Sequence, residues 1–180
     1  MRHLIHLKDY TAAEIKEIIE LAIEIKKNPK KYWQALNHKT LIMLFQKSST
    51  RTRLSFEAGM TQLGGHAIFL ESRTSQFSLT DFGDEIRAVM RFGDLLMFRA
   101  TKVADVIKAA SYDQIPVMDA CSEKYHPCQA LGDLLTMAED AGSLDKVKTI
   151  AWLGIQNNAS NTLKITCAKL GINISLLTPK

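Results

Sequence analysis

Hydrophobic and polar positions follow a helical spacing in the first part of the chain. The segment opens with Thr11-Ala-Ala-Glu14, a pattern in which the threonine and the glutamate three residues later cap the same helix start. Apolar residues then recur every three or four positions, with lysines and glutamates between them. This spacing predicts an amphipathic surface helix whose apolar positions are Ile15, Ile18, Ile19, Ala22 and Ile25.

Short continuous apolar runs then alternate with further helical patterns. The apolar runs predict strands at Lys39–Phe45, His66–Leu70, Asp94–Arg99, Ile115–Cys121, Lys148–Leu153 and Ile172–Leu177. The patterns between them predict helices at Arg53–Leu63, Asp84–Phe92, Val103–Ser111, Pro127–Ala141 and Ser160–Leu170. Continuous apolar runs are typical of parallel strands that are buried on both faces. The order of the elements therefore predicts an α/β fold, with a parallel sheet flanked by helices in three layers (αβα).

A polar stretch at 139–146 divides this pattern into two unequal parts. We expect a first domain over residues 1–142 and the truncated beginning of a second, similar domain over residues 143–180, which holds one strand–helix–strand unit. Such a unit cannot close a sheet by itself. Its apolar residues are therefore expected to form an exposed face around Ile150, Trp152, Ile172 and Ile174.

Composition narrows the class of protein only slightly. The chain of 180 residues is 46% hydrophobic with a net charge of +4, which is ordinary for a globular protein. The basic residues are not interleaved with aromatic ones, and no apolar run approaches the ~20 residues of a membrane span, so we expect neither a nucleic-acid partner nor a membrane. Three cysteines without a CxxC pair predict no metal site and no disulfide framework, and favour a cytoplasmic location.

The first candidate for chemistry is the segment Ser48-Ser-Thr-Arg-Thr-Arg53, which follows a predicted strand and opens a predicted helix. A helix N-terminus attracts anions, and arginine binds phosphate through two parallel hydrogen bonds. The alternative is an ordinary helix cap with two solvated arginines. Since Arg51 and Arg53 lie about 200° apart around a helix, we expect Arg51 to meet a ligand and Arg53 to form a structural ion pair.

Two further polar segments follow predicted strands. Arg99 ends the predicted strand Asp94–Arg99. The next predicted strand, Ile115–Cys121, is followed by His126-Pro-Cys-Gln129, which opens a predicted helix. In open α/β sheets the ligand lies at the carboxyl ends of the strands, so these segments and Ser48–Arg53 are expected to line one crevice. Cys128 could also be a nucleophile. Because no base and orienting group accompany it beyond the adjacent histidine, we favour a binding role for this segment.

These segments resemble the motifs of the aspartate/ornithine carbamoyltransferase family. Phe45–Glu57 (FQKSSTRTRLSFE) is similar to its carbamoyl phosphate motif, and His126–Leu131 (HPCQAL) resembles its second motif in the ornithine form. Met60–Leu70 is also typical of the ornithine branch, and the resemblance runs from about residue 2 to residue 180. It implies transfer of a carbamoyl group from carbamoyl phosphate to the δ-amine of L-ornithine, giving citrulline and phosphate in arginine metabolism.

The resemblance also implies a role for each matching residue, with no metal and no cofactor. Ser49, Thr50, Arg51 and Thr52 would hold the phosphate, Arg99 and His126 would polarise the carbonyl oxygen, and Gln129 would contact the amino group. Gln76 would reach into the site of a neighbouring subunit, and Asn158 would bind ornithine. Of these, Arg51, Arg99 and His126 would act in catalysis. Family members are trimers or multiples of trimers, so a homotrimer is expected.

Two departures from the family pattern leave alternatives open. Gln46 stands where the family often has glutamate, and Ile155 stands where the ornithine enzymes usually have aspartate. The second departure allows a carbamoyltransferase with another amine acceptor. Because the resemblance implies that the chain stops inside the second domain, a non-catalytic carbamoyl phosphate-binding module is a further alternative, and we expect residues 1–180 alone to be nearly inactive.

Overall fold

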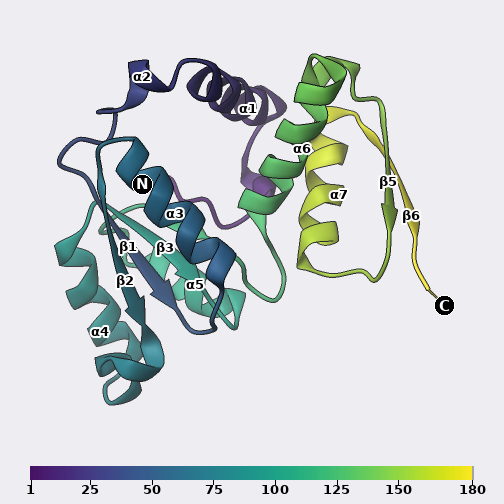
Figure 1. Cartoon of the computed structure of the whole chain (residues 1–180). Coiled ribbons are helices and arrows are strands. Elements are labelled where there is room, and N and C mark those ends of the chain that lie inside the picture. The colour runs from purple at the N-terminus through teal and green to yellow at the C-terminus, as the bar shows by residue number, and fades with distance from the viewer. Residues whose placement is uncertain (180) are drawn as a thin grey trace. The chain divides into compact units, whose positions relative to one another are not determined.

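The computed structural model describes residues 1–179, and its contacts divide the chain into two compact units (Figure 1). The first unit comprises residues 1–5 and 30–123, and the second comprises residues 6–29 and the chain from residue 124 onward. These units are defined by contacts in space. The domain boundary at 142–143 rests on the sequence pattern and stays a prediction.

The first unit is built on a parallel sheet of four strands in the order β2-β1-β3-β4. The strands are β1 (Thr40–Phe45), β2 (His66–Glu71), β3 (Leu95–Arg99) and β4 (Val117–Asp119). In the register of the central strand β1, Phe45 lies opposite Glu71 on one side and Arg99 on the other. The carboxyl ends of β1, β2 and β3 therefore lie together at one edge of the sheet.

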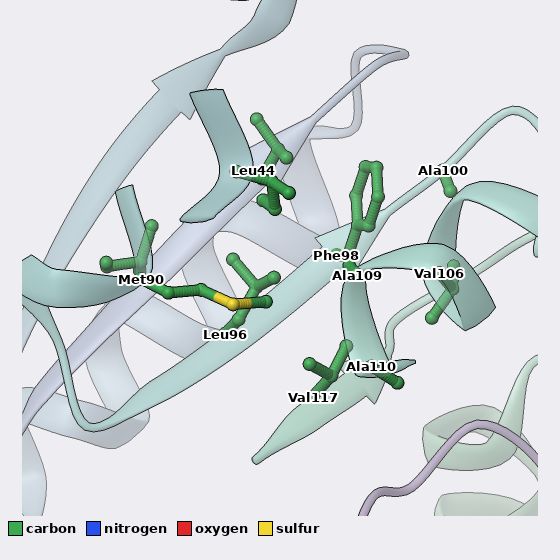
Figure 2. Packing of buried hydrophobic residues seen from close by; sticks show 11 residues of the cluster. Leu44, Met90, Leu96, Phe98, Ala100, Val106, Ala109, Ala110 and Val117 are labelled. Carbon is green, nitrogen blue, oxygen red and sulfur yellow. The ribbon is translucent and has the colours of Figure 1, made fainter. Parts of the chain in front are cut away.

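Helices cover both faces of this sheet, as the three-layer prediction requires (Figure 1). They are α3 (Thr50–Gln62), α4 (Phe82–Val89) and α5 (Val103–Ser111), with short 3₁₀ turns η2 (Ser72–Thr74), η3 (Gln76–Ser78) and η4 (Met90–Phe92) and the short helix α2 (Pro29–Tyr32) before β1. On one face, Leu44, Leu96 and Phe98 pack against Met90 and Val106 (Figure 2). On the other face the strands pack against α3. Burial on both faces explains why these strands are continuously apolar.

The second unit contains three helices and a separate pair of parallel strands. Its elements are η1 (Leu7–Asp9), α1 (Ala12–Lys27), α6 (Pro127–Ala141), η5 (Leu144–Lys146), β5 (Thr149–Leu153), α7 (Asn158–Leu170) and β6 (Asn173–Leu177). Helix α6 packs against both α1 and α7. The predicted capping box at the start of α1 is confirmed, because the Thr11 side chain accepts from the Glu14 backbone and the Glu14 side chain accepts from the Thr11 backbone.

The expected exposed apolar face of the β5–β6 unit is wrong at two of its four residues. Ile150 and Ile172 are only 6% and 7% exposed, because the crossover helix α7 covers one face of the strand pair (Figure 1). The exposed apolar side chains of this unit are instead Leu153, Ile155 and Leu177. The unit therefore buries more of its own apolar surface than the sequence suggested.

Several element boundaries also differ from the sequence prediction; α4, predicted at Asp84–Phe92, is Phe82–Val89, and α7, predicted from Ser160, begins at Asn158. Helix α3 begins at Thr50, three residues before the predicted start, because Ser49 caps it. Strand β4 is reduced to Val117–Asp119, since the preceding Pro116 has no N–H to donate. The N-terminal segment lies beside β4, where the Leu4 N–H donates to the Val117 carbonyl and the Asp119 N–H donates to the Leu4 carbonyl, each at 2.8 Å.

A helix that crosses a membrane must be long and continuously apolar. Within residues 1–179, no helix combines the necessary length and apolar character.

Candidate active site

The start of helix α3 lies directly after β1 and has the form of an anion-binding turn. Ser49 is the N-cap with an extended backbone (φ −165°, ψ 111°). Its hydroxyl accepts from the Thr52 N–H at 3.4 Å and donates to the Thr52 hydroxyl at 3.0 Å. No acidic residue stands in the first turn. The positive end of a 13-residue helix is thus not neutralised by its own side chains.

The two arginines of this turn have different surroundings. The Arg53 Nε donates to Glu57 Oε1 at 2.9 Å, and its guanidinium lies 3.9 Å from the centre of the Phe69 ring. The predicted structural ion pair of Arg53 is therefore confirmed. Arg51 is exposed, and among residues 1–179 no carboxylate lies within ion-pair distance of it. Its role as a ligand residue stays a prediction.

Arg99 brings the end of β3 to this helix start. Its Nη1 donates to the Thr52 hydroxyl at 3.4 Å, so Ser49, Thr52 and Arg99 form one hydrogen-bonded group, which joins two of the three segments expected to line one crevice. The Arg99 Nε is buried and has no hydrogen-bond partner within the described residues. An unsatisfied buried donor of a charged group costs about 1–3 kcal/mol or more, and an anionic ligand would satisfy it.

A hollow of about 410 Å³ lies beside the same loop, but its chemistry does not suit phosphate. It is lined by Ser48, Ser49 and Thr50 together with Arg53, Glu57 and Glu71 and the apolar side chains of Phe45, Leu54 and Phe69. Its charged side chains are two carboxylates and one arginine that is already paired. We therefore expect a dianion at the group of Ser49, Thr52 and Arg99 and not in this hollow.

Gln76, another residue of the first unit that the family resemblance assigns to the carbamoyl phosphate site, lies outside this hydrogen-bonded group. It begins the 3₁₀ turn η3, its side chain is exposed, and no hydrogen bond connects it with Ser49, Thr52 or Arg99. A role in the site of a neighbouring subunit, as the family resemblance implies, stays a prediction.

The remaining predicted residues belong to the second unit. His126 precedes helix α6, and its N–H donates to the Thr162 hydroxyl at 2.9 Å. The same hydroxyl donates to the Asn158 carbonyl at 2.9 Å. Thr162 thereby connects His126 with the start of α7, where Asn158 lies. Gln129 is exposed and donates to Asp133 at 2.8 Å.

A buried carboxyl at the carboxyl end of β4 was not expected from the sequence. Asp119 ends β4 next to the end of β3 and is fully buried. Burial raises its pKa to about 7, while the charge of Lys47 acts in the opposite direction. The signal in the sequence was an aspartate inside the apolar run Ile115–Cys121, which we had interpreted as a longer strand.

Within residues 1–179, no three histidine, cysteine, aspartate or glutamate side chains approach closely enough to hold a metal ion. The polar groups at the start of α3 in the first unit are guanidinium, hydroxyl and helix N–H groups. Such groups bind an anion and stabilise developing negative charge on oxygen.

Comparisons with known proteins agree with this chemistry. Residues 2–139 match the family described as aspartate/ornithine carbamoyltransferase, carbamoyl-P binding domain. The catabolic ornithine carbamoyltransferase of Halobacterium salinarum is 39% identical over the whole chain, and the anabolic enzyme of Campylobacter jejuni is 41% identical. The chain spans 60% and 58% of the lengths of these two relatives.

A solved structure gives the same result for the fold. The ornithine carbamoyltransferase from Pyrococcus furiosus superposes with a TM-score of 0.91 at 39% identity, covering 99% of this chain and 57% of that one. The family match, the sequence identities and the shared fold agree over nearly all of the described residues. The chain belongs to the aspartate/ornithine carbamoyltransferase family.

Proposed function

We propose that this chain forms the carbamoyl phosphate-binding part of an ornithine carbamoyltransferase. The observation that carries the proposal is the group formed by Arg99, Thr52 and Ser49 at a helix start that has no acidic residue, with Arg51 left without a carboxylate partner. The enzyme moves the carbamoyl group from carbamoyl phosphate to the δ-amine of L-ornithine, and citrulline and phosphate are the products.

In this proposal the first unit binds the leaving group. The N–H groups of the first turn of α3, the hydroxyls of Ser49, Thr50 and Thr52, and the Arg51 guanidinium surround the phosphate. Each of these groups donates hydrogen bonds, and the backbone N–H groups are already oriented by the helix, so they need little reorganisation when the bond to phosphate breaks. Phosphate then leaves with its charge neutralised.

The carbonyl oxygen of the carbamoyl group needs a second set of donors. Attack by the neutral amine places negative charge on this oxygen, and Arg99 and His126 are proposed to donate to it. The buried Nε of Arg99, which lacks an acceptor among the described residues, supports its part of the proposal. Gln129 is proposed to accept from the amino group, which fixes the orientation of the carbonyl carbon for attack.

The proposal that ornithine is the amine acceptor rests mainly on the names of the relatives. Fewer residues of this chain support it than support the carbamoyl phosphate site. Asn158 begins α7 and is proposed to bind the amino acid. Ile155, 69% exposed in the same loop, offers no charge to the α-amino group. A different amine acceptor is therefore the second candidate, and the direction of the pathway is open, since relatives with catabolic and anabolic names match equally well.

Assembly and location complete the proposal. We propose a homotrimer or a multiple of trimers, in which the exposed Gln76 serves the site of the neighbouring subunit. We also propose a cytoplasmic enzyme, because three cysteines without a CxxC pair fit a reducing compartment.

The binding half is tested by titrating the ¹⁵N-labelled chain with carbamoyl phosphate and following its amide resonances. We expect saturable shifts at Thr50, Arg51 and Thr52, larger than those caused by equal ionic strength of chloride. Shifts confined to the hollow around Glu57 and Glu71 would refute the site.

The transfer half is tested by joining to this chain the remaining segment of the Pyrococcus furiosus relative and measuring products with ornithine, lysine and putrescine as amines. Citrulline from ornithine alone supports the proposal. A carbamoylated product from another amine supports the second candidate, and binding without any transfer supports the non-catalytic module.

A further inference from the structure

We infer that Gln46 is a positioning residue, which holds the end of β3 with Arg99 at a fixed distance from the anion-binding start of α3. The inference rests on the proposed carbamoyl phosphate site. Gln46 touches neither the proposed phosphate position nor the reacting atoms. It acts through Arg99 and the helix start, and its partners are Thr101 and Asp105.

Three hydrogen bonds from one residue connect the two segments. The backbone N–H of Gln46 donates to the Arg99 carbonyl at 3.0 Å. Its side-chain Oε1 accepts from the Thr101 N–H at 2.7 Å, and its Nε2 donates to Asp105 Oδ2 at 2.9 Å. Gln46 is therefore bonded to the last residue of β3, to the loop that follows it and to the first turn of α5.

Because of where Gln46 lies in the chain, these bonds connect the segment that leads to α3 with the segment that follows Arg99. Gln46 immediately follows β1 and precedes the cap Ser49 by three residues, whereas Thr101 follows Arg99 by two. The direct contact between the two segments, from Arg99 to the Thr52 hydroxyl, is long at 3.4 Å. A long neutral-acceptor bond of this kind fixes geometry poorly. The pairing of β1 with β3 fixes the strands themselves, and the two side-chain bonds of Gln46 hold the segment beyond Arg99 against the segment that leads to α3.

In this chain the partners of residue 46, Thr101 and Asp105, favour an amide at this position. Asp105 can only accept a hydrogen bond and the Thr101 N–H can only donate one, so the residue between them must donate on one side and accept on the other. Glutamine does both. An ionised glutamate would still accept from Thr101 but would place a second carboxylate against Asp105. A protonated glutamate would regain the missing donor.

Neighbouring charges do not remove this preference for an amide at position 46. Gln46 and Asp105 line a hollow of about 280 Å³, whose other charged side chain is Arg73 of η2. Lys47 is the next residue along the chain, and Glu123 accepts from the Val103 N–H at the start of α5. Arg73 makes a hydrogen bond to Glu71 at 3.4 Å, so its charge is shared with another carboxylate. Two carboxylates at 46 and 105 would therefore still compete for one proton.

The test is the affinity for carbamoyl phosphate of wild type and Gln46→Glu, measured by amide-shift titration between about pH 5.5 and 8.5, with inorganic phosphate as a second probe. The ratio of the variant's dissociation constant to that of the wild type cancels the titration of the ligand itself. We expect a ratio of about ten at the alkaline end, falling to within about twofold at the acidic end, where a shared proton restores the donor.

Matched variants of Asp105 separate positioning from general damage to the fold. Asp105→Asn keeps an acceptor for Gln46 and should bind within about twofold of wild type, whereas the similarly shaped Asp105→Leu cannot accept and should bind about fivefold more weakly. In the double variant Gln46→Glu/Asp105→Asn the donor and acceptor are exchanged, and wild-type affinity should return at every pH. If Gln46→Glu does not fold, the comparison of Asp105→Asn with Asp105→Leu still tests the inference.

Two results would overturn the inference. One is wild-type affinity of both Gln46→Glu and Asp105→Leu at every pH, with or without a lower melting temperature. The other is a double variant that binds no better than Gln46→Glu. If the wild-type chain binds neither probe, the proposed carbamoyl phosphate site is itself wrong and the inference fails with it. If the wild-type chain binds and the variants bind with the same affinity, only the positioning role of Gln46 is refuted, and the proposed carbamoyl phosphate site stands.

Discussion

The two arginines at the start of α3 allow a prediction in which binding and stability separate. Arg51 is exposed and has no carboxylate partner within the described residues, so Arg51→Ala breaks no ion pair of the fold. Its free energy of unfolding should stay within about 0.5 kcal/mol of wild type. If Arg51 holds the phosphate, the variant loses a charge-assisted hydrogen bond worth about 1.5–3 kcal/mol, and its affinity for carbamoyl phosphate falls roughly 10- to 150-fold.

Arg53→Ala should show the opposite behaviour. The variant loses the 2.9 Å ion pair with Glu57, whose side chains are 46% and 33% exposed, so this contribution is about 0.3–0.5 kcal/mol. It also loses the stacking of the guanidinium at 3.9 Å from the Phe69 ring, which adds about 0.5–1 kcal/mol. We expect the free energy of unfolding to fall by about 1 kcal/mol while the affinity changes less than about threefold.

Both quantities are measured on the same samples, the affinity by amide-shift titration and the stability by urea denaturation. Arg51→Lys serves as a control, since it keeps the charge but cannot form two parallel bonds, and its affinity should lie between those of wild type and Arg51→Ala. An Arg53→Ala variant that loses as much affinity as Arg51→Ala, or more, would refute the division of roles between the two residues.

Three further predictions concern stability, pH and assembly. Thr162→Val removes the acceptor for the His126 N–H and should cost about 1–3 kcal/mol in urea denaturation, whereas Thr166→Val, equally buried and bonded only to the Thr162 carbonyl at 2.8 Å, should cost less. Equal costs would contradict the connection between α6 and α7. Because the pKa of Asp119 is raised, wild type has its full stability below about pH 4 and loses stability as pH rises through about 7, where the buried carboxyl ionises. Asp119→Asn has no such loss, so its free energy of unfolding should rise relative to that of wild type over this range. A difference between the two free energies that stays constant with pH would refute the burial argument. Sedimentation at high micromolar concentration should give a trimer, and a monomer alone would count against the proposed assembly.

The sequence predicted the architecture well because burial on both sides leaves a strong pattern. The apolar runs of β1 and β3 were located to within one residue, and the limits of α5 and α6 agree with the prediction. The ends of elements were harder where a side chain decides them. The hydroxyl of Ser49 starts α3 three residues early, and the turns at Ser72–Thr74 and Gln76–Ser78 lie in what had been interpreted as loop.

The site was predictable where a residue's chemistry shows in the sequence, and less so where a partner decides its role. The arginines, the hydroxyls and the histidine are visible as donors next to predicted strand ends, and the structure joins Ser49, Thr52 and Arg99. Gln46 was noted only as a departure from a family pattern, because its effect depends on Asp105, 59 positions later in the chain. Such a contact follows from the pairing of β1 with β3 and has no local signal.

The pairing of Leu4 with β4 has a consequence for the behaviour of the protein in solution. Strand β4 ends the sheet, and the unpaired N–H and C=O groups of such a strand can pair with another chain. The bonds from Leu4 to Val117 and from Asp119 to Leu4 occupy these groups. Removing residues 1–5, or displacing them with a bulky N-terminal tag, would uncover a template for edge-to-edge aggregation. The first few residues thus protect the sheet from misassembly. If a preparation precipitates after such a change, we expect the cause to be the uncovered strand β4 and not a damaged ligand site.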